Sequence, residues 1–166
     1  MKVYQLIDRK YMGILSDELS KQIIFELIKR ERTPMELMKI LKKPILAIWK
    51  RLNDMSSAKV VEVVGIKRRI GGPLMRIYRA SAVIYLVDDF VVIYPDKYSI
   101  FFNIFKDLNI EFLKNLEKYN QIPNGVDPIK YAALAFLRAF TETLKNRDFL
   151  DKKLSEIEEL LNKIKL

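Results

Sequence analysis

The chain of 166 residues contains neither cysteine nor histidine. Without cysteine, it has no disulfide bonds and no thiolate metal ligands. Without histidine, it lacks imidazole metal ligands and histidine-based acid–base catalysis. A carboxylate-only metal site is chemically allowed, but no group of Asp and Glu residues has a recognisable ligand spacing. The sequence therefore gives no reason to expect a metal or a cofactor.

Long apolar runs and catalytic motifs are also lacking. The apolar segments are shorter than the roughly 20 residues of a membrane-spanning helix, and no signal peptide is recognisable. No phosphate-binding loop or nucleophile elbow is present. The carboxylates of Asp88-Asp89 fit a turn, and those of Glu156, Glu158 and Glu159 fit an exposed helix face. We expect a cytoplasmic protein that is not an enzyme.

Positive charge is abundant, and it is concentrated in one half of the chain. The net charge is +9, from 30 Lys and Arg against 21 Asp and Glu; residues 1–80 hold 18 basic and 8 acidic side chains, residues 81–166 hold 12 and 13. This asymmetry favours a polyanionic partner for the first half. The alternative is a solubilising, lysine-rich surface of a heat-adapted protein. The composition also suggests a thermophilic archaeal source.

Residues 16–80 show the pattern of three helices followed by two strands. Ser16 is expected to cap a first helix whose apolar residues between Leu19 and Ile28 have helical spacing. Thr33–Glu36 has the capping-box pattern with proline at the first helical position. A third helix is expected from Pro44, and strands are expected at 60–66 and 75–80.

Several segments within residues 12–80 have a pattern that belongs to a known family. They are Leu15–Asp17, Ile23–Ile28, Thr33–Leu41, Ala47–Leu52 and Met55–Val61. In these segments the chain resembles the ArsR-type winged helix-turn-helix transcription regulators. The resemblance implies a DNA-binding domain with its recognition helix from Pro44 and its wing in the strand pair.

Three features of this chain differ from that family's pattern. The usual polar opening of the recognition helix is Pro44-Ile45-Leu46 here, and the glycine that commonly follows that helix is Lys59. Many ArsR-type proteins also sense metals through cysteine and histidine, which this chain does not have.

The third helix supplies the candidate base-reading residues. With its apolar side as the core direction, Leu46, Lys50 and Asn53 point outward and Trp49 lies on the flank. Lys50 can reach a phosphate or a guanine edge, and Asn53 can pair with adenine. Trp49 contacts the DNA backbone or thymine methyl groups, or else packs inside the domain. Leu46 suits a thymine methyl group or a protein interface.

The segment between the strands supplies the candidate wing contacts. Lys67, Arg68 and Arg69 precede Gly71-Gly72, a turn pair that keeps the tip slim. A slim, arginine-bearing tip suits the narrow minor groove, although the same run can be a solvated charge cluster.

Four further cations flank these residues. Arg76 and Arg79 lie on the returning strand, and Lys42 and Lys43 lie in the turn before the third helix. All four are candidates for phosphate contacts, and of these Lys42, Lys43 and Arg76 complete the predicted DNA-binding set.

Residues 81–166 are predicted to form a strand pair, at Val83–Val87 and Phe90–Tyr94, and a helical region. Helices are expected from about Lys97 to Tyr119, from Asp127-Pro128 through Arg147, and over Phe149–Ile164. Apolar residues at 150, 154, 157, 161 and 164 have the spacing of a helical seam. We therefore predict a homodimerisation region; the alternative is that these helices complete a monomeric core.

The predicted fold class is mainly helical α+β: a winged-helix domain at 1–80 followed by a helical dimerisation region at 81–166. The predicted function is sequence-specific binding of double-stranded DNA by a homodimeric transcription regulator. The alternative is a protein-interaction module or an architectural module that binds DNA non-specifically. Aromatic residues of the second half can form a core or a ligand pocket, and we predict no small-molecule effector. They are Tyr85, Tyr94, Tyr98, Phe101, Phe102, Phe105, Phe136 and Phe140.

Overall fold

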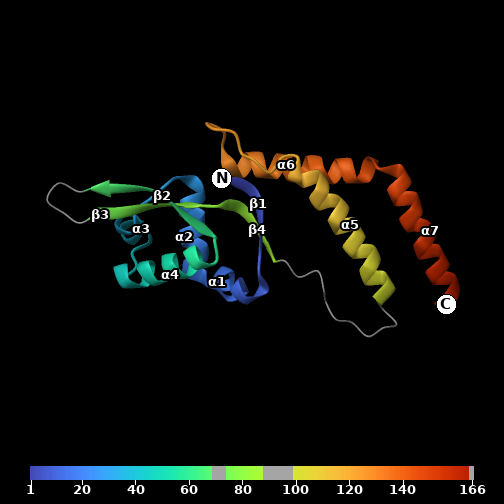
Figure 1. The fold of residues 1–166 in the computed structure, drawn as a ribbon, viewed down its shortest axis with the longest axis horizontal. Helices are drawn as coiled ribbons and strands as arrows, with labels where there is room; N and C mark the ends of the chain where they lie inside the picture. Colours follow the sequence, from blue (N-terminus) through green and yellow to red (C-terminus); the bar gives the residue numbers. More distant parts are fainter. Residues whose placement is uncertain (69–73, 88–98, 165–166) are drawn as a thin grey trace. The chain divides into compact units, whose positions relative to one another are not determined.

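A computed structural model describes residues 1–68, 74–87 and 99–164 (Figure 1). In this part of the chain the fold is α+β and mainly helical, as the sequence predicts. The chain divides into two compact units: Met1–Asp89 with Gln121–Ala132, and Phe90–Asn120 with Ala133–Leu166. The two units are described separately.

The first unit contains the predicted order of three helices and two strands, with additional elements on both sides. Its elements are β1 (Lys2–Ile7), a 3-10 turn (Arg9–Tyr11), α1 (Met12–Ser16), α2 (Glu18–Lys29), α3 (Pro34–Leu41), α4 (Ile45–Ser57), β2 (Val61–Arg68), β3 (Leu74–Ala80) and β4 (Ala82–Val87).

The start of α2 corrects the prediction that Ser16 caps it. Ser16 is the last residue of α1, and its hydroxyl donates to the carbonyl of Met12. The cap of α2 is Asp17, whose carboxylate accepts from the backbone N–H of Ser20 at 2.9 Å. Both residues are good N-caps, but a charged carboxylate is the better acceptor at a positive helix end.

The capping box of α3 is confirmed. The hydroxyl of Thr33 accepts from the N–H of Glu36, and the Glu36 carboxylate accepts from the N–H of Thr33 at 2.7 Å. At the other end of α3, Lys42 closes the helix with φ 52° in the left-handed region. Helix α4 begins at Ile45, one residue after the predicted start, and Pro44 occupies the N-cap position without a side-chain hydrogen bond.

The core of the first unit forms where α2, α3 and α4 meet the two strands β2 and β3. The predicted apolar sides of the helices are buried there, including Ile48, Leu52 and Met55 of α4. After α4 the chain turns through Lys59, whose φ is 57°. Because Lys59 itself takes the left-handed conformation, this turn forms without a glycine.

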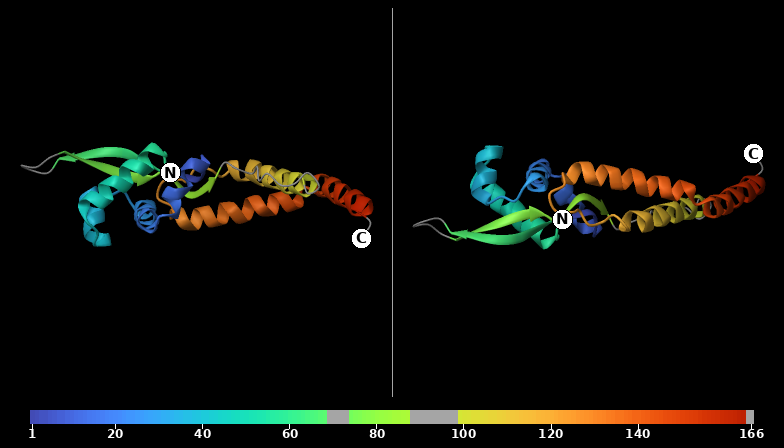
Figure 2. Two further views of the ribbon diagram at one scale, coloured as in Figure 1. Left: turned by 90° about the horizontal axis from the view of Figure 1, so that it is seen from below. Right: turned by 90° about the horizontal axis from the view of Figure 1, so that it is seen from above.

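Strands β2 and β3 form an antiparallel hairpin that extends as an arm at the edge of the helices (Figure 2). The pairing register shifts between Val63 and Gly65, which indicates a bulge at Val64. On its other side β3 is bridged by Arg32, which exchanges backbone hydrogen bonds with Tyr78. The segment before α3 thus fastens the base of the hairpin to the helices.

Strand β1 is an element that the sequence analysis did not predict. It pairs in parallel with β4, and Tyr4 lies opposite Ile84. The predicted strand at Val83–Val87 is therefore present, and its partner is the start of the chain. The proposed partner strand at Phe90–Tyr94 lies outside the described residues.

The second unit contains α5 (Ser99–Glu117), most of α6 (Pro128–Lys145) and α7 (Arg147–Ile164). All three helices match the predicted ranges closely. Asn115 of α5 donates to the Thr143 hydroxyl of α6 at 3.0 Å, and Lys153 of α7 pairs with Asp107 of α5. None of the described helices has the length and apolar character of a membrane span.

Candidate nucleic-acid interface

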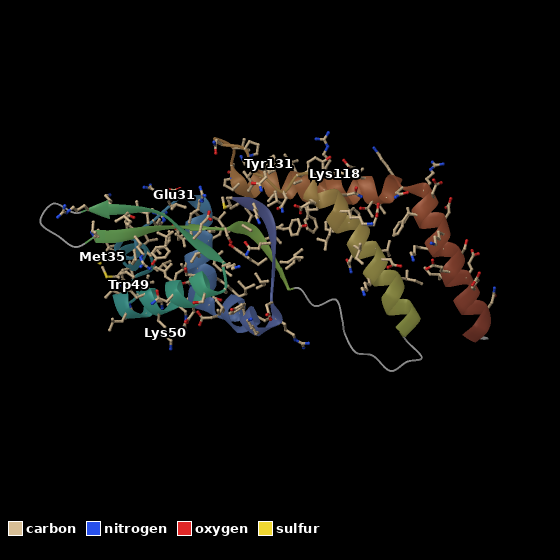
Figure 3. All side chains as sticks on the ribbon, in the orientation of Figure 1. Glu31, Met35, Trp49, Lys50, Lys118 and Tyr131 are labelled. Atoms are coloured by element: carbon tan, nitrogen blue, oxygen red, sulfur yellow. The ribbon has the colours of Figure 1, made fainter. Side chains whose placement is uncertain are left out.

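One face of α4 is left uncovered by the fold. Leu46, Lys50, Asn53 and Ser57 follow each other at helical spacing, and all four are exposed. Leu46 is 79% exposed. Figure 3 shows Lys50 projecting from α4 on the side away from the hairpin. The outward direction that the sequence predicts for Leu46, Lys50 and Asn53 is thus the direction in the structure.

Trp49 is half-buried, so its position is intermediate between the two predicted ones, contact with DNA and packing inside the domain. Leu52, which lies three residues further along α4, is fully buried, whereas the adjacent Lys50 is exposed. Part of the indole is therefore available to a partner, and part of it contacts the domain.

An ion pair fixes α4 relative to α2. Arg51 donates from Nε and Nη2 to the two carboxylate oxygens of Asp17, at 2.8 and 2.9 Å. The Arg51 guanidinium and the N–H of Ser20 lower the pKa of Asp17 from 3.8 to about 2. Because both hydrogen bonds are charge-assisted and the pair is bidentate, they define the orientation of α4 closely.

The turn between α3 and α4 adds three exposed cations. Lys39 lies in the last turn of α3, and Lys42 and Lys43 follow it closely. The left-handed Lys42 ends α3 sharply, so that the three side chains emerge close to the start of α4. Lys39 was not among the sequence-predicted residues, although its position near two predicted lysines was a usable signal.

The hairpin carries three more exposed cations, Lys67, Arg68 and Arg76. Lys67 and Met75 line a shallow concavity with α3 residues that include Met35 and Lys39. Arg69, also predicted for the wing, lies outside the described residues. Arg76 is exposed as predicted, because β3 runs past the end of the helical core.

Glu36 is the carboxylate in that concavity, and it is already engaged. The N–H of Thr33, first among several donors and charges, lowers the pKa of Glu36. Its hydrogen bonds with Thr33 belong to the capping box of α3. Lys67 lies near enough to contribute electrostatically to this shift.

Some cations of the first unit have their charge compensated by a carboxylate, and others do not. Arg79 pairs with Glu62 at 2.8 Å and lies 3.5 Å from Glu31, so its charge is compensated at the base of the hairpin. Arg32 pairs likewise with Glu26. Within residues 1–68 and 74–87, no ion pair is made by Lys39, Lys42, Lys43, Lys50, Lys67, Arg68 or Arg76.

We call these seven cations the unpaired basic set. They come from three parts of the first unit: the α3–α4 turn, the outer face of α4 and the hairpin, and Lys39 and Lys67 line the same concavity. The carboxylates of this unit are mostly held by other cations or by a helix cap. The set therefore presents positive charge without internal compensation, an arrangement that suits phosphate groups.

A second uncovered surface lies on α6. The buried positions of α6 in the second unit carry small side chains, Ala135, Ala139 and Thr143. From Ala133 to Leu144 the opposite side exposes six uncharged residues at helical spacing, and the exposed Lys130 lies on the same side one turn earlier. We call this side the α6 apolar face; it consists of Ala133, Leu134, Leu137, Phe140, Thr141 and Leu144.

The α6 apolar face is more extensive than the described part of the predicted seam on α7. Leu134 is 66% and Leu137 is 63% exposed, and the Thr141 hydroxyl is satisfied by the Leu137 carbonyl. On α7, Leu154 is exposed, whereas Leu150 and Ile157 are half-buried. The sequence of the second half is rich in apolar helical surface, but its spacing does not show which side of α6 the fold covers.

Comparison of the chain with models of protein families gives no match, and comparison with curated proteins gives no significant similarity. Function is therefore inferred from the residues of this chain and their arrangement. Across the described residues, no group of three acidic side chains is arranged to hold a metal ion.

Proposed function

We propose that the first unit is a winged-helix domain that binds double-stranded DNA, and that the chain is a sequence-specific transcription regulator of the ArsR type. The observation that carries this proposal is the unpaired basic set. Seven exposed cations that make no ion pair with described residues lie on a helix pair and on a hairpin, the two kinds of element with which a winged helix contacts a duplex.

Within this proposal α4 is the recognition helix. Lys50 and Asn53 enter the major groove, where Lys recognises guanine and Asn recognises adenine. The side chain of Asn53 makes no hydrogen bond with other described residues, so its amide is free to pair with a base. Lys39, Lys42 and Lys43 contact phosphates beside α4, and Lys67, Arg68 and Arg76 contact the backbone or the minor groove.

We further propose that the regulator is a homodimer and that the α6 apolar face contributes to its interface. Contiguous exposed apolar surface of this kind marks protein–protein interaction sites. A two-fold dimer presents two recognition helices to half-sites about one helical turn apart on DNA. The predicted seam on α7 belongs to the same region of the chain and extends the interface.

A protein-interaction module is the second candidate, because Leu46 is almost fully exposed on the proposed recognition helix. The two candidates respond differently to salt. Binding that depends on phosphate contacts weakens steeply as the salt concentration rises, whereas apolar association does not.

The test is fluorescence anisotropy of labelled duplexes at several salt concentrations, with the protein's own upstream region compared with random DNA. We expect salt-sensitive binding that prefers the upstream duplex. Equal affinity for both duplexes would identify an architectural protein. Lack of binding at low salt would exclude the DNA proposal and leave the protein-interaction module.

A pair of variants tests the assignment of α4. Lys50→Ala/Asn53→Ala is expected to reduce the preference for the upstream duplex about tenfold or more, since a good base contact contributes about 1–3 kcal/mol to discrimination. Lys21→Ala/Gln22→Ala is the matched control, because it removes one lysine and one amide from α2. An unchanged preference in the first variant would show that α4 does not read the bases.

A further inference from the structure

The β2–β3 hairpin has a face that combines two arginines with two large aliphatic residues. Ile66 lies opposite Arg76, and Arg68 lies opposite Leu74. Cross-strand partners share one face of a sheet, and residues two apart on a strand share it too. The register therefore places Ile66, Arg68, Leu74 and Arg76 together, and we call them the hairpin face.

The fold makes no use of the hairpin face. All four side chains are exposed, and Ile66 and Leu74 are 64% and 66% exposed. The opposite side of the hairpin is the one that borders α3, through Lys67 and Met75. Ile66 and Leu74 are thus exposed to solvent, whereas Lys67 and Met75 on the other side of the hairpin lie beside α3.

The charge of this face indicates the kind of partner. Its two guanidinium groups make no ion pair with described residues, and none of its four residues is acidic. A protein partner would need carboxylates placed against both arginines and an apolar patch between them. A duplex supplies phosphates on both sides of a groove, with stacked bases between them.

Arginine beside large aliphatic residues is the combination used by proteins that bend DNA from the minor groove. Their basic side chains hold the groove, and Ile, Leu, Met or Phe side chains enter a base step and partly unstack it. Flexible pyrimidine–purine steps accept such a wedge most readily. The hairpin face has both components on a single surface.

We propose that Ile66 and Leu74 insert at a base step from the minor groove, while Arg68 and Arg76 contact the flanking strands, so that binding bends the duplex. This inference rests on the proposed DNA binding and adds a second source of specificity. The α4 residues read base edges, and the hairpin face selects sites by how easily they deform.

The experiment measures binding and bending on the same samples. A duplex of roughly 30 base pairs, labelled at its two ends, reports bending by energy transfer, and anisotropy reports the fraction bound. The variant is Ile66→Ala/Leu74→Ala, and the control is Val63→Ala, an exposed aliphatic residue of β2 on the other side of the bulge, which is not one of the four residues of the hairpin face. Circular dichroism verifies that both variants are folded.

We expect the saturated wild-type complex to bend the duplex by roughly 20–90°. Ile66→Ala/Leu74→Ala is expected to bind with an affinity within about tenfold of wild type and to leave the duplex close to straight. The affinity changes little because two effects oppose each other. The variant avoids the free-energy cost of unstacking the bases, but it also loses the apolar contacts that the unstacked step allows. Val63→Ala is expected to bend DNA as wild type does. A 2-aminopurine base at the step is expected to brighten on binding of wild type and Val63→Ala, and to stay dim with the double variant.

Two results would overturn the inference while leaving DNA binding intact. One is a saturated wild-type complex whose duplex stays straight. The other is a double variant that bends DNA as strongly as wild type. Absence of binding in the anisotropy channel at low salt would instead refute the proposed function, and the inference with it.

Discussion

The outer face of α4 and the outer face of α6 are both left uncovered, yet their chemistry is opposite. On α4 the exposed stripe contains Lys50, Asn53 and Ser57, and the neighbouring turn and hairpin add unpaired cations. On α6 the exposed stripe from Ala133 to Leu144 is uncharged and carries large apolar side chains such as Leu137 and Phe140. One helix is suited to a polyanion and the other to an apolar partner.

The same contrast extends to the two halves of the chain. Residues 1–80 have a net charge of +10, whereas residues 81–166 have a net charge of −1. Two copies of a strongly basic surface repel each other, whereas two nearly neutral surfaces do not. The proposed contact with DNA and the proposed contact between copies therefore belong to separate parts of this chain, and we expect the two contacts to respond in opposite ways to salt.

The largest effect is expected when charge is introduced into the α6 apolar face. Leu137→Glu/Phe140→Glu is expected to weaken self-association at least 100-fold, because burying an unpaired carboxylate costs several kcal/mol and about 1.4 kcal/mol corresponds to tenfold. Sedimentation analysis over a range of micromolar concentrations measures the dimer fraction. The control Lys152→Glu/Ser155→Glu adds two carboxylates at exposed positions of α7.

A wild-type protein that sediments as a monomer throughout this range would contradict the assignment of the α6 apolar face to a dimer interface. A dimer that survives the α6 variant would move the interface to the seam on α7. The control variant is expected to remain dimeric, since its substitutions lie outside the α6 apolar face.

An intermediate effect is expected when hairpin cations are removed. Lys67→Ala/Arg68→Ala/Arg76→Ala is expected to lower duplex affinity about 10–100-fold at low salt. The slope of log affinity against log salt is expected to fall by about 0.9 for each phosphate that the protein no longer neutralises. Anisotropy titrations at several salt concentrations measure both quantities.

The matched control removes the same charge from the second unit. Lys106, Lys145 and Lys152 are exposed, and their replacement by alanine is expected to leave the salt slope unchanged. Equal losses in the two triple variants would mean that only net charge matters, and the distinction between the units would fail.

The smallest effect is expected at the ion pair that orients α4. Asp17→Asn keeps a helix cap but removes the charge that Arg51 contacts, and is expected to lower the free energy of unfolding by about 1–2 kcal/mol. Asp8→Asn is the control; Asp8 pairs with Lys10 at an exposed site, where ion pairs contribute little. Denaturant unfolding at neutral pH measures both variants.

The pH dependence of this difference has a defined sign. The pKa of Asp17 is lowered in the folded state to about 2 from 3.8, so its stabilisation is complete above 3.8 and is lost as the pH falls toward 2. The stability difference between wild type and Asp17→Asn is therefore expected to close over that interval. A difference that persists unchanged at pH values near 2 would contradict a charge-based role.

Local sequence signals predicted most helix boundaries, because caps and apolar spacing act within one or two turns. The capping box at Thr33 and Glu36 was predicted residue by residue, and the range of α6 was predicted to within two residues. The cap of α2 was missed by one residue, since Ser16 and Asp17 are both competent caps, and the ion pair with Arg51, which forms only in the folded chain, adds to the advantage of the charged carboxylate.

Strand pairing and ion pairing between distant segments could not be predicted from the sequence. Strand β1 forms because β4, about 80 residues later, offers a parallel edge, and no local pattern reveals such a partner. Among the basic residues, Arg79 and Arg76 lie on the same strand. Only the fold brings Glu62 and Glu31 to Arg79 and leaves Arg76 unpaired.

Residues close together in the chain were enough to predict the helices and the β2–β3 strand pair, and composition alone shows the charge asymmetry. The tertiary structure decided which charges are compensated and which apolar sides are covered, because both depend on segments that meet only after folding. The unpaired basic set and the α6 apolar face belong to this second kind of information. They are the surfaces on which the proposed function depends.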